Sequence, residues 1–184
     1  DKPGEPGRAK KKFRGIGFKL SGRVTLMHVV FSAVMILVSY ELFYQACVYN
    51  YSRASWAMAK VLSLDIDGDM FAQAVNLGRP DRQWLDTKKH FDQVRTNGRV
   101  KFVYAVAPGD DPQTLKYYAA GNYEPAIGSP QSRADFSPEL LKTIDTGEDS
   151  LTKIYDLGER PNGESGGVIS AFVPIFDSSG QAVG

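Results

Sequence analysis

Alternating aspartates form the sequence pattern that comes closest to a recognisable chemical motif. They are Asp65, Asp67 and Asp69. A calcium loop carries acidic oxygens at positions 1, 3 and 5, a glycine at position 6 and a glutamate at position 12. Here Gly68 falls at position 4, while Met70 and Asn76 occupy positions 6 and 12. The spacing therefore favours a solvated helix end over a calcium site.

Other patterns that could support catalysis or metal binding are weaker. A single cysteine, Cys47, excludes an internal disulfide and a cysteine zinc site, and two histidines are too few to favour a histidine-built metal site. Ser165 lacks the Gly-x-Ser-x-Gly elbow of hydrolases. Gly15-x-Gly17 precedes an apolar segment, whereas a nucleotide-binding glycine loop follows a strand. We therefore expect no catalytic residues, no metal and no cofactor.

Charge is distributed very unevenly along the chain. Residues 1–23 carry eight basic and two acidic side chains, whereas the rest of the chain carries 14 basic and 19 acidic ones. An uncharged run, Val24–Tyr40, follows the basic stretch. As a helix, residues 24–44 would be about 32 Å long, close to the roughly 30 Å core of a bilayer. By the positive-inside rule, the pattern predicts a cytoplasmic tail at 1–23, a transmembrane helix at 24–44 of the inner membrane, and an extracytoplasmic remainder. Nucleic-acid binding by the basic tail is not expected, because an apolar segment follows it.

Two alternatives to a retained membrane anchor remain open. The apolar run could be the core helix of a soluble domain, although such helices seldom have a basic cluster at one end. It could also be a cleaved signal peptide. The best cleavage position, before Cys47, would place Tyr44 where signal peptidase requires a small residue, and a lipoprotein site at Cys47 fails for a similar reason.

Beyond the membrane, the sequence predicts one α+β domain over residues 45–184. Apolar spacing predicts that a long stalk helix continues the transmembrane helix through about residue 75, and Asp81 could cap the next helix. Ser137 and Pro138 mark the start of a short helix. β-branched and aromatic runs predict five strands at 100–106, 114–119, 151–157, 167–176 and 181–184. Because the chain begins with Asp1 and ends within the fifth strand, we expect it to be part of a longer protein, truncated at that strand.

Two stretches carry a resemblance to a known family. Phe102–Val106 and Phe172–Gly184, the latter containing an aromatic-x-Pro-Ile-x-Asp-x-x-Gly hairpin pattern, resemble the extracytoplasmic single-Cache sensor domains of bacterial transmembrane receptors. Leu64–Asp69 is similar to the end of that family's first helix. The resemblance implies a PAS-like fold with a five-stranded antiparallel sheet and helices packed on it. It also implies a signal-transduction role whose output domain (methyl-accepting, histidine kinase, diguanylate cyclase or phosphatase) is not in this chain.

The resemblance also implies where a ligand would bind. In PAS-like folds the pocket lies between the sheet and the segment inserted after the second strand. Five residues could reach it: Tyr104, Lys116, Tyr118, Arg133 and Tyr155. The two cations would suit a carboxylate, and the tyrosines would supply walls and hydroxyl donors. The alternative for each of these residues is ordinary core or surface packing.

One apolar stripe along the stalk helix predicts self-association. Its members are Val48, Tyr51, Ala54, Met58, Val61 and Leu62. Pairing with a second stalk helix would give this stripe a partner, so we expect a homodimer. Two other functions stay open: a membrane-tethered extracytoplasmic enzyme, and a structural or assembly domain that binds no small molecule.

Overall fold

The computed structural model describes residues 8–98, 100–121, 126–156 and 167–184, and for 8–19 and 155–156 it describes the backbone alone. These residues form an α+β structure that divides into two compact units, Asp1–Tyr49 and Asn50–Gly184.

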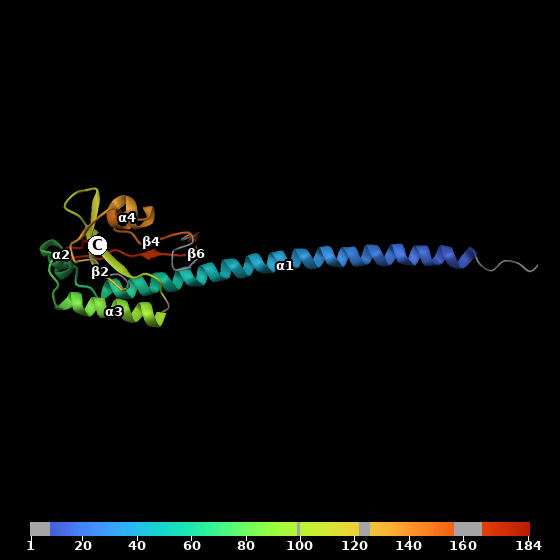
Figure 1. Cartoon of the computed structure of the whole chain (residues 1–184), viewed down its shortest axis with the longest axis horizontal. Coiled ribbons are helices and arrows are strands. Elements are labelled where there is room, and N and C mark those ends of the chain that lie inside the picture. The colour runs from blue at the N-terminus through green and yellow to red at the C-terminus, as the bar shows by residue number, and fades with distance from the viewer. Residues whose placement is uncertain (1–7, 99, 122–125, 157–166) are drawn as a thin grey trace, which may run out of the picture. The chain divides into compact units, whose positions relative to one another are not determined.

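Helix α1 (Arg8–Leu64) contains the candidate membrane span. It runs without interruption over 57 residues, as Figure 1 shows. Among the described helices, only its segment Leu20–Leu64 is long and apolar enough to cross a membrane, and no part of its most apolar window is buried. Length and composition alone support this assignment, and a signal sequence would meet the same criteria.

The expectation that the stalk helix runs on to about residue 75 is wrong. Helix α1 ends at Leu64, and a separate helix α2 (Gly68–Leu77) follows. Asp67 causes the restart, because its Oδ1 accepts hydrogen bonds from the backbone N–H groups of Asp69 and Met70, both at 3.0 Å. Gly78 closes α2 in the left-handed conformation (φ 59°), near the expected end of the helical stretch at about residue 75.

The two remaining α-helices begin at the predicted capping residues. Helix α3 (Arg82–Gly98) is capped by Asp81, whose Oδ1 accepts a 2.7 Å bond from the N–H of Trp84. Helix α4 (Pro138–Thr146) is capped by Ser137, with the expected proline in its first turn.

Strands β1 (Tyr104–Pro108) and β2 (Thr114–Ala120) form the predicted hairpin. A β-bulge lies between Ala105 and Val106. A short strand β3 (Pro130–Ser132), which is not among the five predicted strands, pairs with β2 and forms a sheet edge. A 3₁₀ turn, η1 (Arg133–Asp135), then leads towards α4.

The predicted strands 151–157 and 167–176 pair with each other as an interrupted ribbon. Strand β4 (Ser150–Leu151) pairs with β7 (Ala171–Phe172), and β5 (Tyr155–Asp156) pairs with β6 (Gly167–Val168). Both pairs are antiparallel.

The expected five-stranded sheet is therefore wrong for the described residues, which form one three-stranded and two two-stranded sheets. Thr152 interrupts the ribbon. Its N–H donates to the carbonyl of Ser170 at 2.9 Å, but the Ser170 N–H donates to the Thr152 hydroxyl at 2.8 Å instead of to a backbone carbonyl. A side chain thus replaces one rung of the ladder, and the ribbon divides into two short pairs.

A tight turn at residues 177–180 forms the tip of the hairpin pattern noted in the sequence. Asp177 Oδ1 accepts bonds from the N–H and hydroxyl of Ser179 at 2.9 and 2.7 Å and from the N–H of Gln181 at 2.8 Å. These bonds, led by those from Ser179, hold the pKa of Asp177 below its ordinary value of 3.8. The turn returns the chain so that Phe176 and Ala182 form a bridge.

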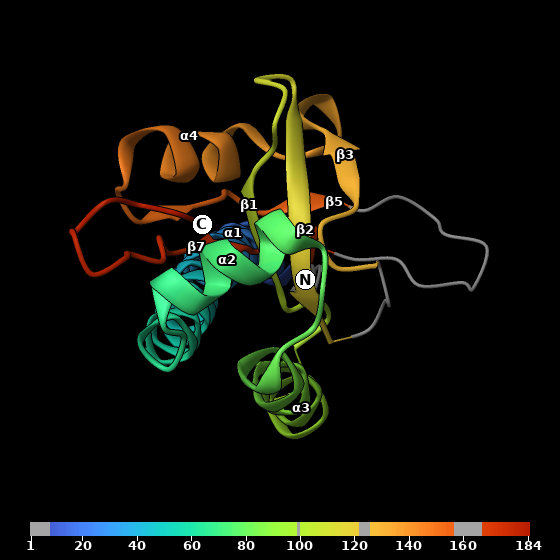
Figure 2. The ribbon, with the colours of Figure 1, turned by 90° about the vertical axis from the view of Figure 1, so that its left-hand side faces the viewer.

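The hairpin β1–β2 separates two apolar clusters. One face packs on α2 and α3 through a cluster that includes Phe71, Phe91 and Tyr118. The other face packs towards α4 through Val106, Leu115 and Leu140. In Figures 1 and 2 the strands accordingly lie between α4 on one side and α3 on the other.

Candidate functional site

The two candidate tyrosines of the hairpin lie on opposite faces. Tyr104 belongs to the cluster facing α4, where its ring centre lies 6.2 Å from that of Tyr117 and 6.5 Å from that of Phe136. Tyr118 is completely buried in the other cluster, with its ring centre 4.6 Å from that of Phe71. These two residues therefore do not share a pocket.

Burial dominates the chemistry of Tyr118. Removal of its hydroxyl from water raises the pKa of Tyr118 above the ordinary 10.0, although a hydrogen bond from Gln83 opposes the shift. That bond, from Gln83 Nε2, is long at 3.4 Å. The Tyr118 carbonyl accepts a 2.6 Å bond from the indole of Trp84. The residue thus fastens α3 to β2.

Alkaline pH should destabilise the domain through Tyr118. The pKa of Tyr118 is raised in the folded state, so folding favours the neutral hydroxyl. This contribution to the free energy of unfolding is complete below pH 10.0, and it is lost as the pH rises towards the pKa of the folded state. In Tyr118→Phe, which cannot ionise, this loss should be absent. Near pH 8 we expect the free energy of unfolding of the variant to be about 1 kcal/mol below that of the wild type. Above pH 10 this difference in the free energy of unfolding should narrow or reverse. Denaturant unfolding at both pH values measures this, and an unchanged gap would contradict it.

Both candidate cations form ion pairs with aspartates of the same chain. Lys116 Nζ lies 2.6 Å from Asp110 Oδ1 at the end of the hairpin. Arg133 makes a two-pronged contact with Asp145 of α4, with N–O distances of 2.6 and 2.7 Å. Neither cation is among the residues that line the cavity described below, which Tyr104 borders. The side chain of Tyr155 lies outside the described residues.

The alternating aspartates have separate structural roles. Asp67 caps α2, Asp69 Oδ1 accepts a 3.3 Å bond from the N–H of Ser178, and Asp65 lies 3.8 Å from His90. Within the described ranges, no three His, Cys, Asp or Glu side chains are grouped so that they could hold a metal ion.

A cavity of about 370 Å³ lies inside the unit Asn50–Gly184. Helix α1 forms one wall through Ser55, Met58 and Leu62, and the edge of β1 from Val103 to Val106 forms another. Further walls come from α3, from α4 and from the segment 168–173 around β7. Of the four candidate site residues whose side chains the structure describes, Tyr104 is the one that lines this space.

Most of the cavity wall is apolar. It includes Phe91, Phe136, Leu140 and Phe172 in addition to Met58 and Leu62. Two of its polar side chains are engaged elsewhere: the Thr143 hydroxyl lies 2.6 Å from that of Ser150, and the Ser63 hydroxyl donates to the Lys60 carbonyl at 3.0 Å. Lys101 and Asp135 also border the space. Such a cavity suits an apolar or amphipathic small molecule better than a carboxylate.

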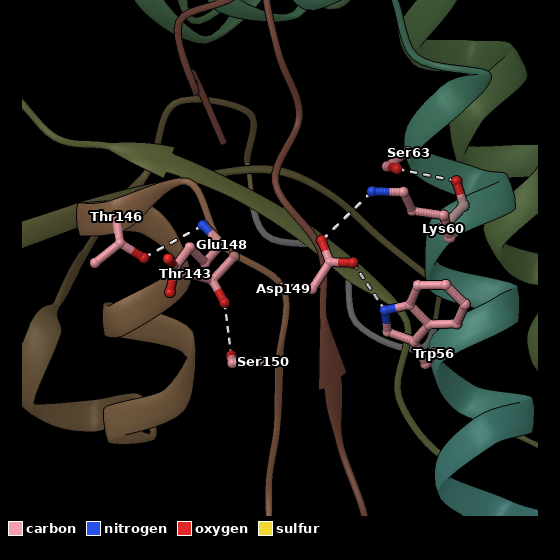
Figure 3. A network of polar contacts seen from close by, with 8 residues as sticks. All are labelled: Trp56, Lys60, Ser63, Thr143, Thr146, Glu148, Asp149 and Ser150. Carbon is pink, nitrogen blue, oxygen red and sulfur yellow. Dashed lines mark hydrogen bonds and ion pairs between the residues drawn. The ribbon is translucent and has the colours of Figure 1, made fainter.

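Polar contacts fasten α1 to the turn between α4 and β4. Figure 3 shows the Asp149 carboxylate between two side chains of the helix. It accepts a 2.9 Å bond from the indole N–H of Trp56, and Lys60 Nζ lies 3.4 Å away. Nearby, the Ser150 hydroxyl donates to the Glu139 carbonyl at 2.7 Å. Two walls of the cavity are therefore joined through Asp149.

Sequence reasoning did not identify the cavity residues of α1. Met58 and Leu62 were assigned to a single stripe with Ala54 and Val61, but the structure places the first two on the cavity wall and leaves the other two exposed. The available signal was that the helix is apolar on more than one face, which indicates more than one packing partner. Asp149 lies 93 residues after Trp56 and 89 residues after Lys60, so no local sequence pattern could predict these contacts.

Comparison of the chain with protein-family models, with curated proteins and with solved structures finds no match.

Proposed function

We propose that this chain carries the extracytoplasmic sensor domain of a membrane-anchored receptor, and that its ligand binds in the cavity beside α1. The supporting observation is that one uninterrupted helix contains the candidate membrane span and also provides Ser55, Met58 and Leu62 to the cavity wall. A ligand in the cavity would contact this helix directly. Binding that differs between two positions of the helix shifts their populations, which is the physical requirement for a signal.

The orientation in the membrane is part of the proposal. The basic stretch 1–23 stays in the cytoplasm and the unit Asn50–Gly184 lies outside, as the charge asymmetry favours. In a bacterium with two membranes, the anchor would lie in the inner one.

The ligand class follows from the cavity wall. A volume of about 370 Å³ is at the small end of the range for ligand pockets. Aromatic and aliphatic side chains dominate its wall, and the charged groups Lys101 and Asp135 lie at its border. The ligand is therefore proposed to be a small apolar molecule, with any polar group directed towards those residues. Arg133 and Lys116 have no part in this proposal.

We also propose that the domain is related to single-Cache sensors. The element order supports this: a long helix, two further helices, a hairpin with a short third strand, an inserted helix and then four short strands. The last residue, Gly184, lies beside both the segment after β7 and strand β1. Its carbonyl accepts a 2.6 Å bond from the Ile175 N–H, and a Cβ at this position would lie 2.8 Å from the carbonyl oxygen of Val106 on β1.

A thermal-shift screen of the full chain in lipid nanodiscs tests the sensor proposal. The panel contains small apolar alcohols, aromatic compounds, fatty acids, amino acids and dicarboxylates. One apolar class should stabilise the protein saturably by several degrees, as expected for a ligand that binds only the folded state.

A cavity-filling variant locates the binding. Ala59 lines the cavity, so Ala59→Leu should remove the shift, whereas Gln73→Leu on the exposed surface of α2 should retain it. A folded Ala59→Leu protein that still responds fully would exclude this cavity as the site. If no compound shifts the wild type, a structural or assembly role would replace the sensor proposal.

A further inference from the structure

Polar contacts run along one side of the cavity, between α1 and the turn that joins α4 to β4. Trp56 and Lys60 each follow a lining residue of the helix, Ser55 and Ala59, by one position. At 100° per residue, their side chains therefore lie beside one edge of the helix face that lines the cavity. The carboxylate of Asp149 reaches both side chains from the turn, as Figure 3 shows.

The exposure of these three side chains places them between the cavity and the solvent. Trp56 is 37% exposed, and the side chains of Lys60 and Asp149 are 38% and 29% exposed. A carboxylate at such a boundary forms a stronger hydrogen bond than one in open water, because fewer water molecules compete for the donor and the acceptor. Loss of the bonds at this boundary would let solvent reach the cavity wall behind them.

Asp149 is held on its own wall independently of α1. The next residue, Ser150, pairs with Phe172 in the ladder between β4 and β7, and its hydroxyl donates to the Glu139 carbonyl of α4. Helix α1, by contrast, faces a space of about 370 Å³ between itself and this wall. Apolar packing across a space of that size is weaker than in a filled core. The bonds to Asp149 therefore carry a larger share of the attachment between the two walls.

We infer that Asp149 closes the cavity by holding α1 to the α4–β4 turn, and that release of its bonds to Trp56 and Lys60 opens a path from the solvent. The indole bond, at 2.9 Å, carries most of the closure, because the Lys60 contact is 3.4 Å long and partly exposed ion pairs contribute little. Passage of a ligand along this path rests on the proposed function. The closure itself does not, so its test uses no ligand.

Thiol modification of a cysteine on the cavity wall measures the closure in the full chain in lipid nanodiscs. The background is Cys47→Ser, because Cys47 is the single cysteine of the sequence. Ala59→Cys places the reporter thiol on the wall formed by α1. Adding Asp149→Ala should raise the rate at which a water-soluble thiol reagent modifies this cysteine by at least about tenfold. Loss of one hydrogen bond to a charged group shifts a local opening equilibrium by a factor of this size.

Further substitutions separate the two bonds. Trp56→Phe removes the donor and keeps an aromatic ring, so it should accelerate modification as much as Asp149→Ala, and the two changes together should add little. Asp149→Asn retains an acceptor oxygen for the indole, so the rate should stay within about threefold of that of the reporter protein. Glu148→Ala is the matched control, because Glu148 is the preceding acid, is 68% exposed and pairs with Lys142 of α4. It should leave the rate unchanged.

A second reporter distinguishes local opening from loss of the fold. Ala74 of α2 is 3% exposed in the core cluster with Phe71 and does not line the cavity. Asp149→Ala should leave the modification rate of Ala74→Cys unchanged. The same acceleration at both reporters, or no acceleration of Ala59→Cys, would overturn the inference. A ligand screen without hits would contradict the proposed function and leave these rates as expected.

Discussion

Phe71→Ala should lower the free energy of unfolding of the unit Asn50–Gly184 by about 3–5 kcal/mol. Phe71 is completely buried, and its ring packs on that of Tyr118 with centres 4.6 Å apart. Truncation would remove the apolar contacts that fix α2 on β2 and leave a cavity that the surrounding backbone could not close. The melting temperature should fall by roughly 10–20 °C.

Met70→Ala is the matched control for this substitution. Met70 is the preceding residue of the same helix, but it is 40% exposed, so its truncation should cost under about 1 kcal/mol. Thermal unfolding of the full chain in nanodiscs, followed by tryptophan fluorescence, compares the two variants. If Phe71→Ala and Met70→Ala melted at the same temperature, the packing of α2 on the sheet would be wrong.

Gly68→Ala should lower the free energy of unfolding by about 3 kcal/mol, the second large effect that we expect. A Cβ at Gly68 would lie 2.2 Å from the carbonyl oxygen and 2.6 Å from the carbonyl carbon of Phe176. These are backbone atoms, and the Phe176–Ala182 bridge holds them in place. Since no rotamer change can relieve the overlap, α2 must move away from the closing turn. That movement would also strain the bond from the Ser178 N–H to Asp69.

Gly98→Ala offers a comparison with the same added methyl group. A Cβ there would lie 3.3 Å from a side-chain methyl of Val100, which can rotate or shift. Gly98 lies at the end of α3, so we expect its replacement to change stability by less than about 1 kcal/mol. Urea unfolding of both variants measures the difference. A Gly68→Ala protein as stable as Gly98→Ala would show that the approach of α2 to Phe176 is not close.

The sequence alone determined much of the local structure, because local signals act over a few residues. Asp81 and Ser137 predicted the starts of α3 and α4, since a capping side chain needs only the N–H groups of the next turn. The turn after Asp177 followed from the same kind of short-range bonding. The length and hydropathy of the apolar run likewise predicted one candidate membrane helix without reference to any other segment.

Tertiary structure alone decided which face each residue occupies and which strands meet. Strand runs could be read from composition, but the hydroxyl of Thr152 replaces a rung in the ribbon, and that contact is made with Ser170, 18 residues away. The bulge between Ala105 and Val106 places Tyr104 and Tyr118 on opposite faces, so these two predicted site residues do not share a pocket. On α1, Met58 and Leu62 of the single expected stripe line the cavity while Ala54 and Val61 stay exposed, because the position of β1 and α4 determines which side of the helix is covered. Contacts between distant segments determine which face each residue occupies and which strands pair, and the periodicity of one segment cannot predict those contacts.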